Sequence, residues 1–383
     1  MTKVGRKPNP ILTIAVDCGS LSQQNKEQLG GIHTVTINLL TELARIDKRN
    51  LYLLYSFAPI PQELMRSFGK SMRNVVLPQF LGYKSLWLPL HLWFTKPQIF
   101  LALAQAIPPF APPTLGLVYD LATIKNKTAY SNSRRLQQNT DTLVRRSKHI
   151  ITTSEASKTD IQKKYQLGYR SVTVSFPGVE SIFTAHGTKY VDTIPYFLYV
   201  GAMKKTKNVA RIIEAFASVN ASTGGRCRLV LIGSKKDADP HIGESIKHTG
   251  VEKFLSFKGY VSRKDLPKYM RGALAFVSPA LSEGFGLPLL EAMSCGCPVI
   301  TANNSSMPEV VGNAGIMINA DDSGMLAKSM QRIFDDPTLR KKLSRHSLTQ
   351  AKKFTNRRFA RDVLLTIYKI LRTEKKADES KQL

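Results

Sequence analysis

Two glutamates, Glu283 and Glu291, stand eight residues apart on the two sides of a glycine-rich loop in this 383-residue chain. The loop reads EGFGL from Glu283, and Pro288 then opens an apolar run with the pattern of a helix. The glycines let the backbone approach a ligand closely, and the free amides at the start of a helix attract negative charge, so the junction can hold an anion or the polar edge of a sugar. The residues alone leave three interpretations open: an acid–base pair, two ligand-binding carboxylates, or the polar residues of an ordinary turn.

The elements around this loop are typical of an open α/β sheet. Short apolar runs alternate with helical patterns along the whole chain, which predicts βαβ units and parallel sheets whose ligands bind at the carboxyl ends of the strands. In the first half we expect strands at Ile11–Val16, Leu51–Ser56, Asn74–Leu77, Ile99–Leu103, Leu115–Tyr119 and His149–Thr153. In the second half we expect them at Phe197–Val200, Arg228–Ile232, Phe254–Phe257, Ala273–Ser278, Val299–Thr301 and Ile316–Ile318. Helices are expected at Ile32–Arg45 and Ser131–Arg146, and Ser154 is expected to cap a further helix.

The pattern lapses once, over residues 180–196, which are polar, rich in turn residues and without periodicity. We place the boundary between two doubly wound domains there. The expected divisions are a first Rossmann-like domain over 1–184, a linker over 185–196, a second Rossmann-like domain over 197–356, a helix over 357–373 and a disordered, charged tail over 374–383.

The net charge of +27 favours polyanionic partners, namely nucleic acid, an anionic membrane face or phosphorylated substrates. The charge is dispersed, because residues 1–185 carry 23 Lys or Arg and 10 Asp or Glu, or +13, which leaves +14 for the remainder. Since no nucleic-acid-binding motif accompanies it, the charge is a weak argument for nucleic acid. The hydrophobic content of 43% excludes a disordered chain.

The four cysteines, Cys18, Cys227, Cys295 and Cys297, have no metal-binding spacing. The last two form a lone C-G-C without a second Cys or His pair at zinc spacing. We therefore expect buried free thiols in a reducing compartment, and no metal site.

Two apolar segments imitate membrane signals. Ile11–Val16 follows basic residues but stops at Asp17, too short for a secretory core, and is expected to be a strand. Residues 85–107 are strongly apolar but contain Pro89 and Lys96, so they hold no uninterrupted span of about 20 apolar residues. A core helix followed by a strand is expected there, and a surface that dips into a membrane is the alternative.

The Glu283-x7-Glu291 pattern, within EGFGLPLLEAMSCGCPVI, resembles the signature of retaining group 1 (family four) glycosyltransferases, and of their mannosyltransferases most of all. Further segments resemble landmarks of this family in order: Leu29–His33, Pro177–Val179, Phe197–Gly201, Lys204–Asn208, Lys258–Ser262 and residues 305–315. The resemblance covers nearly the whole chain. It implies the GT-B fold, in which two Rossmann-like domains face a central cleft. The first domain then binds the acceptor, the second binds the nucleotide sugar, and the C-terminal helix crosses back to the first domain.

The resemblance also implies roles for individual residues. Glu291 binds the ribose hydroxyls of the donor, Glu283 approaches the hydroxyls of the transferred sugar, and Lys207 neutralises the diphosphate leaving group without a metal. The implied donor-binding set is completed by Gly201, Lys204, Lys205, Tyr260, Gly284, Phe285, Gly286 and Leu287. The implied acceptor-side loop contains Gly30, Gly31 and His33.

This chain departs from the family pattern at two places. Ala202 and Thr206 occupy the positions where the family usually places an arginine beside the phosphate-binding lysine, and lysines are not bidentate substitutes for it. Tyr119-Asp120 stands where the family has His-Asp, so Tyr119, Asp120 and Glu283 form the expected catalytic set. Glu309 is expected either to cap the following helical turn or to touch ligand.

The expected function is therefore retaining transfer of a hexose from a nucleoside-diphosphate sugar to a glycan or lipid-linked acceptor in polysaccharide biosynthesis of the cell envelope. GDP-mannose is the first donor expected, UDP-glucose and UDP-N-acetylglucosamine remain open, and no cofactor or nucleic-acid partner is expected. The basic surface and the region of Trp87 and Trp93 suggest a cytoplasmic protein that is peripheral on an anionic membrane face. A catalytically weak or inactive homologue that binds sugar nucleotides or glycans is the alternative, motivated by Tyr119, Ala202 and Thr206. A nucleic-acid-binding protein is a third, motivated only by the charge.

Overall fold

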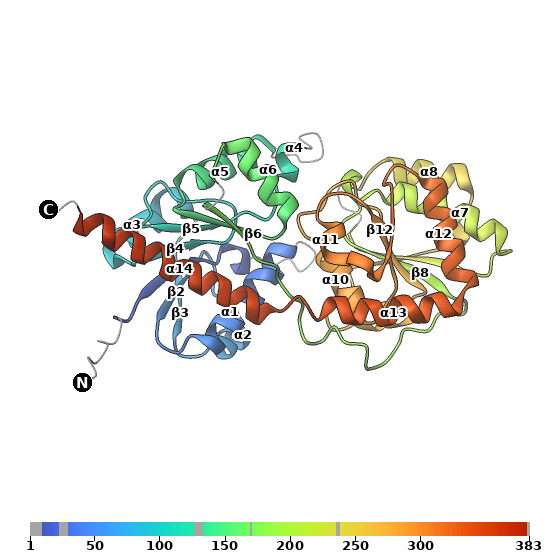
Figure 1. Ribbon diagram of the computed structural model, residues 1–383, viewed down its shortest axis with the longest axis horizontal. Coiled ribbons are helices and arrows are strands. Elements are labelled where there is room, and N and C mark those ends of the chain that lie inside the picture. Colours follow the sequence, from blue (N-terminus) through green and yellow to red (C-terminus); the bar gives the residue numbers. More distant parts are fainter. Residues whose placement is uncertain (1–9, 23–29, 126–132, 169–170, 235–237, 381–383) are drawn as a thin grey trace, which may run out of the picture.

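The chain folds into two α/β domains that lie next to each other along its long axis, as a computed structural model shows (Figure 1). The structure describes residues 10–22, 30–125, 133–168, 171–234 and 238–380. Within these ranges, the first domain holds a seven-stranded sheet of order β3-β2-β1-β4-β5-β6-β7 and the second a six-stranded sheet of order β10-β9-β8-β11-β12-β13. All pairs in both sheets are parallel, and each order reverses once, as in Rossmann-type sheets. The predicted pair of doubly wound sheets is confirmed.

The strands lie where the apolar runs predict them, to within two residues at each end. The first sheet contains β1 (Thr13–Asp17), β2 (Leu51–Ser56), β3 (Met72–Val76), β4 (Ile99–Ala102), β5 (Thr114–Leu117), β6 (His149–Thr152) and β7 (Val172–Val174). The second contains β8 (Tyr196–Val200), β9 (Arg228–Ile232), β10 (Leu255–Gly259), β11 (Ala275–Ser278), β12 (Val299–Ala302) and β13 (Ile316–Ile318). Most central strands are buried along their whole length, which is why they appear as continuous apolar runs. The sequence analysis does not predict β7, an edge strand of three residues.

Helices connect the strands of both sheets. Those of the first domain are α1 (Gly31–Ile46), α2 (Gln62–Phe68), α3 (Leu88–Thr95), α4 (Ala122–Lys125), α5 (Ser133–Arg146) and α6 (Glu155–Tyr165), with the short turns η1 (Gly19–Ser22) and η3 (Tyr83–Trp87). Those that follow are α7 (Val209–Ser222), α8 (His241–Thr249), α9 (Leu266–Gly272), α10 (Leu287–Ser294), α11 (Met307–Val311), α12 (Ser323–Asp335), α13 (Pro337–Ala351) and α14 (Asn356–Glu379), with the turns η6 (Lys205–Lys207), η7 (Glu252–Phe254) and η8 (Gly312–Ala314). Ser154 caps α6 as predicted, because its hydroxyl accepts a hydrogen bond from the Ser157 amide. Leu29 and Ser131, named in the sequence analysis, lie outside the described residues.

The last helix, α14, returns from the second domain to the first (Figure 1). It begins where the Asn356 side chain accepts from the Gly178 amide at 2.9 Å, so the Pro177–Val179 landmark forms its junction with the first domain. Its apolar residues Phe359, Val363 and Ile367 are fully buried in the core of the first sheet. The prediction of a disordered tail from residue 374 is wrong over most of its length, since the helix runs through Glu379. Polarity suggested disorder, but Lys and Glu are good helix formers, and two salt bridges, Lys148–Glu374 and Lys375–Glu379, support this end.

Residues 85–107 form the end of η3, then α3, then β4, so the expected helix followed by a strand is present. No helix in the described ranges is both long enough and apolar enough to cross a membrane. All four cysteines are buried free thiols, as predicted. Among the described residues, no group of three or more His, Cys, Asp or Glu side chains is arranged to hold a metal ion.

Candidate active site

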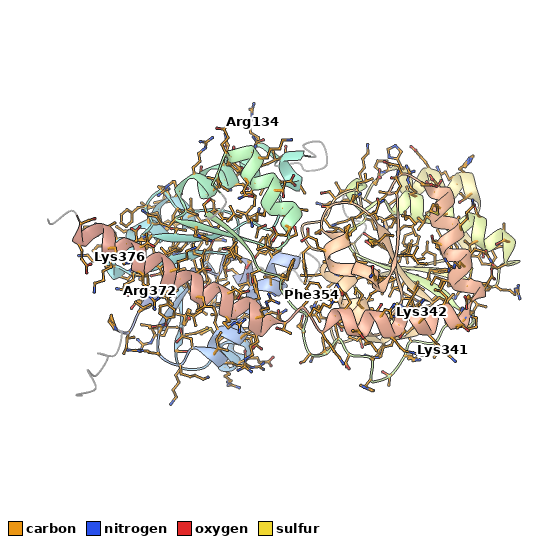
Figure 2. All side chains as sticks on the ribbon, in the orientation of Figure 1. Arg134, Lys341, Lys342, Phe354, Arg372 and Lys376 are labelled. Atoms are coloured by element: carbon orange, nitrogen blue, oxygen red, sulfur yellow. The ribbon has the colours of Figure 1, made fainter. Side chains whose placement is uncertain are left out.

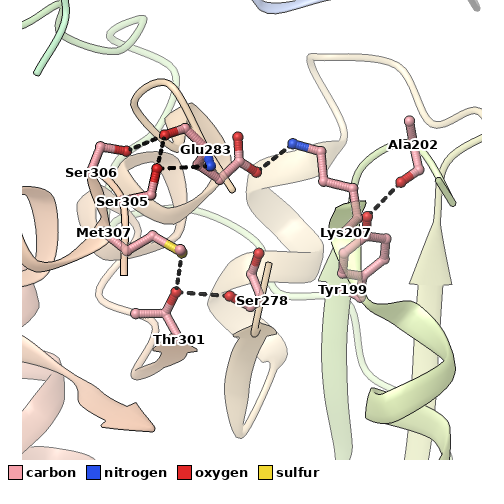
Figure 3. A network of polar contacts seen from close by, with 9 residues as sticks. All are labelled: Tyr199, Ala202, Lys207, Ser278, Glu283, Thr301, Ser305, Ser306 and Met307. Atoms are coloured by element: carbon pink, nitrogen blue, oxygen red, sulfur yellow. Dashed lines mark hydrogen bonds and ion pairs between the residues drawn. The ribbon is translucent and has the colours of Figure 1, made fainter. Parts of the chain in front are cut away.

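The site begins with the loop between β11 and α10, which holds Glu283. Gly286 turns the chain into α10 at φ +88°, a conformation that favours glycine. The hydroxyl groups of Ser305 and Ser306 donate to the Glu283 carbonyl oxygen at 2.7 and 2.9 Å (Figure 3). The backbone of Glu283 is thereby fixed, and its carboxylate points away from both serines (Figure 3).

The Glu283 carboxylate meets Lys207, which lies at the end of η6 in the loop after β8. The Lys207 ammonium donates to Glu283 Oε1 at 2.6 Å (Figure 3). Because β8 and β11 are the neighbours at which the order of the second sheet reverses, both loops flank the crevice where open α/β sheets bind ligands. The structure thus brings together the two residues that sequence analysis assigns to the diphosphate and the transferred sugar.

The first domain contributes Asp120, which follows β5. Asp120 is half-buried, and its carboxylate accepts from the Ala122 amide at 2.9 Å. Burial raises the pKa of Asp120, with a further increase from Glu283 and an opposing decrease from Lys207, so the three charges interact across the domain interface. Lys207, Glu283 and Asp120 form one cluster, which we call the interface triad.

Gly284 lies at a close approach between the domains. The Thr153 hydroxyl, at the end of the first domain's β6, donates to the Gly284 carbonyl oxygen at 3.2 Å. A Cβ atom on Gly284 would lie 2.5 Å from Asp120 Oδ2 and 3.0 Å from the Tyr119 carbonyl oxygen. No side chain fits there unless Asp120 or the loop moves.

Replacing Gly284 by alanine is expected to destabilise this contact between the two domains by about 1 kcal/mol, the lower end of the cost of overpacking. The value of kcat/KM should fall about fivefold. The matched control is Gly243→Ala on α8, where the new Cβ would have no heavy atom within 4 Å. Steady-state kinetics of both variants test the contact. Equal activities for the two variants would show that the site works without this approach.

Tyr119, at the position where the resemblance implies a histidine, has its hydroxyl enclosed at the same interface. Its carbonyl oxygen accepts from the hydroxyls of Thr153 and Ser157, at 3.1 and 3.0 Å. Its own hydroxyl is buried beside Thr36 and has no well-aligned hydrogen-bond partner among the described residues. Burial raises the pKa of Tyr119, so the group is a neutral phenol at physiological pH. An unsatisfied buried hydroxyl costs about 1–3 kcal/mol, which suits a group that a ligand satisfies.

Tyr119→Phe is therefore expected to raise the free energy of unfolding by about 1 kcal/mol and to lower kcat about 5- to 10-fold. Urea denaturation and initial rates measure the two effects. Tyr196→Phe is the control, because the Tyr196 hydroxyl donates to the Tyr269 carbonyl oxygen at 2.7 Å. It should lose stability and keep its rate. A Tyr119→Phe variant that is destabilised at full activity would contradict a ligand-facing hydroxyl.

Glu291 lies on α10, and its side chain is only 4% exposed. Arg263 donates from Nη2 to Glu291 Oε1 and from Nε to Glu180 Oε1, both at 2.6 Å, and its guanidinium lies over the Phe183 ring. Burial raises the pKa of Glu291, and Arg263 acts in the opposite direction. Sequence analysis missed Arg263, although it directly follows the selected segment Lys258–Ser262.

Several predicted donor residues lie elsewhere or face inward. Tyr260 lines an open pocket of about 660 Å³ together with the linker residues 188–191. The structure describes all of the other predicted donor residues, and none of them lines this pocket. Phe285 is buried against Phe176 and Phe354, so only its backbone is available to a ligand. Gly286 and Leu287 lie at the start of α10.

The loop after β8 contains Ala202 and Thr206, the two positions at which the resemblance implies an arginine. Gly201 follows the strand, Lys204 precedes η6, and Lys205 is exposed. Thr206 is 5% exposed and its carbonyl oxygen accepts from the Leu281 amide, so its side chain packs inside. Ala202, which is exposed, accepts from the Tyr199 hydroxyl through its carbonyl oxygen (Figure 3). Neither position supplies a second cation.

The predicted acceptor-side loop leads into α1. Gly30 precedes the helix, and a Cβ on Gly31 would contact Leu287 of the second domain at 3.6 Å. His33 Nδ1 lies 3.0 Å from the Ser20 carbonyl oxygen, a local hydrogen bond. The loop therefore faces the start of α10 through Gly31.

Glu309 joins the two domains. Its carboxylate oxygens accept from the amides of Glu155 and Ala156, at 2.7 and 2.8 Å, at the start of α6 in the first domain. The expectation that Glu309 caps the following helical turn is wrong, because its carboxylate contacts the start of a helix 153 residues or more away in the chain. Contact between Glu309 and a ligand stays a prediction. A carboxylate at the positive end of a helix is a favourable contact, so Glu309 stabilises this contact between the two domains.

Residues 186–350 match the profile of the family described as glycosyl transferases group 1. The chain is 36% identical over 160 residues to the O-antigen chain mannosyltransferase B of Escherichia coli, and the match covers 42% of each chain. The matches to the first curated relatives span less than half of those relatives' own length.

The fold is similar to two solved structures over nearly the whole chain. One is a sucrose-phosphate synthase from Thermosynechococcus elongatus, with a TM-score of 0.74, 16% identity and coverage of 96% of this chain and 100% of that one. The other is the Anabaena protein HepE in complex with UDP-glucose, with a TM-score of 0.72, 18% identity and coverage of 94% and 100%. These similarities confirm the two-domain fold that the sequence analysis expects.

Proposed function

We propose that the chain, which has the GT-B fold and matches the group 1 glycosyl transferases over residues 186–350, belongs to this family and transfers a hexose, with retention of configuration, from a nucleoside-diphosphate sugar to a glycan or lipid-linked acceptor. The observation that carries the proposal is the interface triad, in which the Lys207–Glu283 ion pair of the second domain lies close to Asp120 of the first, the residue that faces Gly284. A transferase that joins two substrates between two domains needs such a meeting point.

In this proposal, Lys207 leaves Glu283 to pair with the donor diphosphate, and Glu283 turns to the hydroxyls of the sugar. Glu291 accepts hydrogen bonds from the ribose. The bond between the anomeric carbon and the diphosphate oxygen breaks as the bond to the acceptor oxygen forms on the same face, and the departing oxygen takes the acceptor's proton. Lys207 and the amides at the start of α10 stabilise the negative charge that develops on the diphosphate, and no metal is assigned to this step.

We further propose GDP-mannose as the donor, supported by the similarity to the Escherichia coli mannosyltransferase. UDP-glucose is the competing donor, because the similar Anabaena structure is a complex with it. An O-antigen mannosyltransferase among the relatives favours a role in cell-envelope polysaccharide synthesis at the cytoplasmic face of the membrane.

A donor panel tests the proposal. GDP-mannose, UDP-glucose and UDP-N-acetylglucosamine are each titrated calorimetrically, and transfer and hydrolysis are followed by nucleotide release. Micromolar binding of one donor, with release that depends on Lys207, is expected. Absence of both binding and release across the panel would overturn the proposal.

A second candidate is a homologue that binds sugar nucleotides but turns them over weakly or not at all. The observation in its favour is that neither Ala202 nor the buried Thr206 provides the arginine that group 1 enzymes usually have. Donor binding without turnover, unchanged in Tyr119→His, would favour this candidate over the enzyme.

A further inference from the structure

The helix α3 is apolar on both of its faces, and only one face is covered. Leu88 and Leu92 are buried in the core of the first domain. On the outer side, Leu90, Trp93 and Phe94 are 42%, 56% and 66% exposed. Because a surface helix normally presents polar side chains to water, this outer face is fit for an apolar partner.

The exposed surface extends into the segment before the helix. Phe80, Leu81 and Leu86 are 63%, 74% and 41% exposed. We call the six residues the apolar ridge: Phe80, Leu81, Leu86, Leu90, Trp93 and Phe94. Trp87 braces the ridge, since its indole N–H donates to the Phe80 carbonyl oxygen at 2.7 Å and its ring packs edge-on against Phe80. Of the two tryptophans, only Trp93 is thus exposed on the ridge.

The stretch of sequence that holds the ridge carries only positive charge. Residues 64–119 contain no Asp or Glu and five cationic residues, Arg66, Lys70, Arg73, Lys84 and Lys96. Arg372 and Lys376 of α14 lie at the same outer end of the first domain (Figure 2), where the nearby Glu374 and Glu379 pair with Lys148 and Lys375. Aromatic rings favour the interface of a bilayer, and each cation near an anionic surface adds about 1 kcal/mol of attraction. Exposed Trp and Phe in a purely cationic stretch match an anionic bilayer.

The ridge also has a definite place relative to the cleft. Lys84, next to its start, pairs with Asp17 at the carboxyl end of β1, the edge of the first sheet that faces the second domain. The helix α3 then leads back to the amino end of β4, towards the outer end of the molecule (Figure 1). A surface docked on this ridge therefore runs from the cleft edge along the first domain.

We propose that the apolar ridge docks the protein on an anionic phospholipid bilayer, with Trp93 and Phe94 entering the interface and the surrounding cations facing the lipid phosphates. The docking stands on this surface alone. Its consequence, that a lipid-linked acceptor reaches the cleft from the bilayer, rests on the proposed function.

Vesicle binding of the full chain tests the docking. Sedimentation is compared for vesicles of phosphatidylcholine alone and of phosphatidylcholine with one quarter phosphatidylglycerol. The Trp87→Phe variant leaves Trp93 as the only tryptophan, and its emission should shift to the blue with the anionic vesicles only. Trp93→Ser with Phe94→Ser is expected to lower the affinity at least about tenfold. The control is Met325→Ser on α12 of the second domain, 48% exposed, which should bind like the wild type.

Three outcomes would overturn the docking: no binding of the wild type to anionic vesicles, equal binding by the double variant, or a wild-type dimer that the double variant abolishes without any vesicle binding. In the last case the ridge joins two copies of the chain. Thermal melting verifies that the double variant is folded, and since both residues are exposed its melting temperature should not change. Calorimetric donor binding on the same preparations separates the docking proposal from the proposed function. A double variant that loses vesicle binding but still binds the donor shows that the ridge serves docking and leaves the donor site intact.

Discussion

Lys207→Met is expected to lower kcat/KM about 10²- to 10³-fold, the loss seen when a preorganised electrostatic partner of a transition-state charge is removed. Methionine keeps the length of the side chain and removes the charge. The effect should fall mainly on kcat, because the diphosphate gains negative charge as the bond to the sugar breaks, and Ala202 and Thr206 offer no second cation. Single-turnover rates at saturating donor measure this step.

The control for Lys207 is Lys247→Met on α8, an exposed lysine of the same domain, which should keep its rate. Loss of Lys207 also removes the ion-pair partner of the Glu283 carboxylate, next to Asp120, so part of the effect is indirect. A double-mutant cycle with Glu283→Gln separates the direct effect on the diphosphate from the indirect effect through Glu283. If the kcat/KM of the double variant is no lower than that of Glu283→Gln alone, Lys207 only positions Glu283 and its role at the diphosphate is wrong.

The second large effect is expected at Glu291. Glu291→Gln should raise the KM and the Kd of the donor about 10- to 100-fold with little change in kcat, because hydrogen bonds to a charged acceptor contribute about 1.5–3 kcal/mol. Calorimetry with the nucleoside diphosphate alone isolates the contribution of the ribose. A Kd that does not change would remove Glu291 from the donor site.

The pH dependence provides an independent check on Glu291. Its carboxylate form binds the ribose, so affinity should fall as the pH drops through the pKa of Glu291. Because burial raises that pKa, the fall should begin at a higher pH than the usual value for glutamate, about 4.3. The charged groups around Glu291 are Arg263, which opposes the rise, and Glu180, which adds to it. Arg263→Gln should therefore move the fall to still higher pH, whereas Glu291→Gln should abolish it.

The fold could be predicted because its determinants are local. Strands buried on both faces must be short apolar runs, and β2, β9 and β13 coincide with the predicted ranges in full. The site loop could be predicted for the same reason, since glycine, proline and the helix start lie within nine residues of Glu283. The helical end of α14 was misjudged because composition alone does not separate a solvated helix from a disordered tail.

The contacts between distant segments could not be predicted. Arg263 meets Glu291 and Glu180 only because the loop after β10, the helix α10 and the segment after β7 converge, although Glu291 and Glu180 are 28 and 83 residues from Arg263 in the chain. The partner of Glu309 is a set of backbone amides, which no residue type reveals. The unsatisfied hydroxyl of Tyr119 likewise depends on what surrounds it, and a sequence shows only that the tyrosine is there.

The path of α14 has a consequence for synthesis on the ribosome. Phe359, Val363 and Ile367 belong to the core of the first domain but follow the whole second domain in the chain. While the second domain emerges and folds, the nascent first domain exposes the groove that these side chains will fill. The N-terminal domain is therefore the last to be completed, and a chain that stops near residue 350 would carry a finished second domain beside an unfinished first one, a ready target for chaperones and proteases.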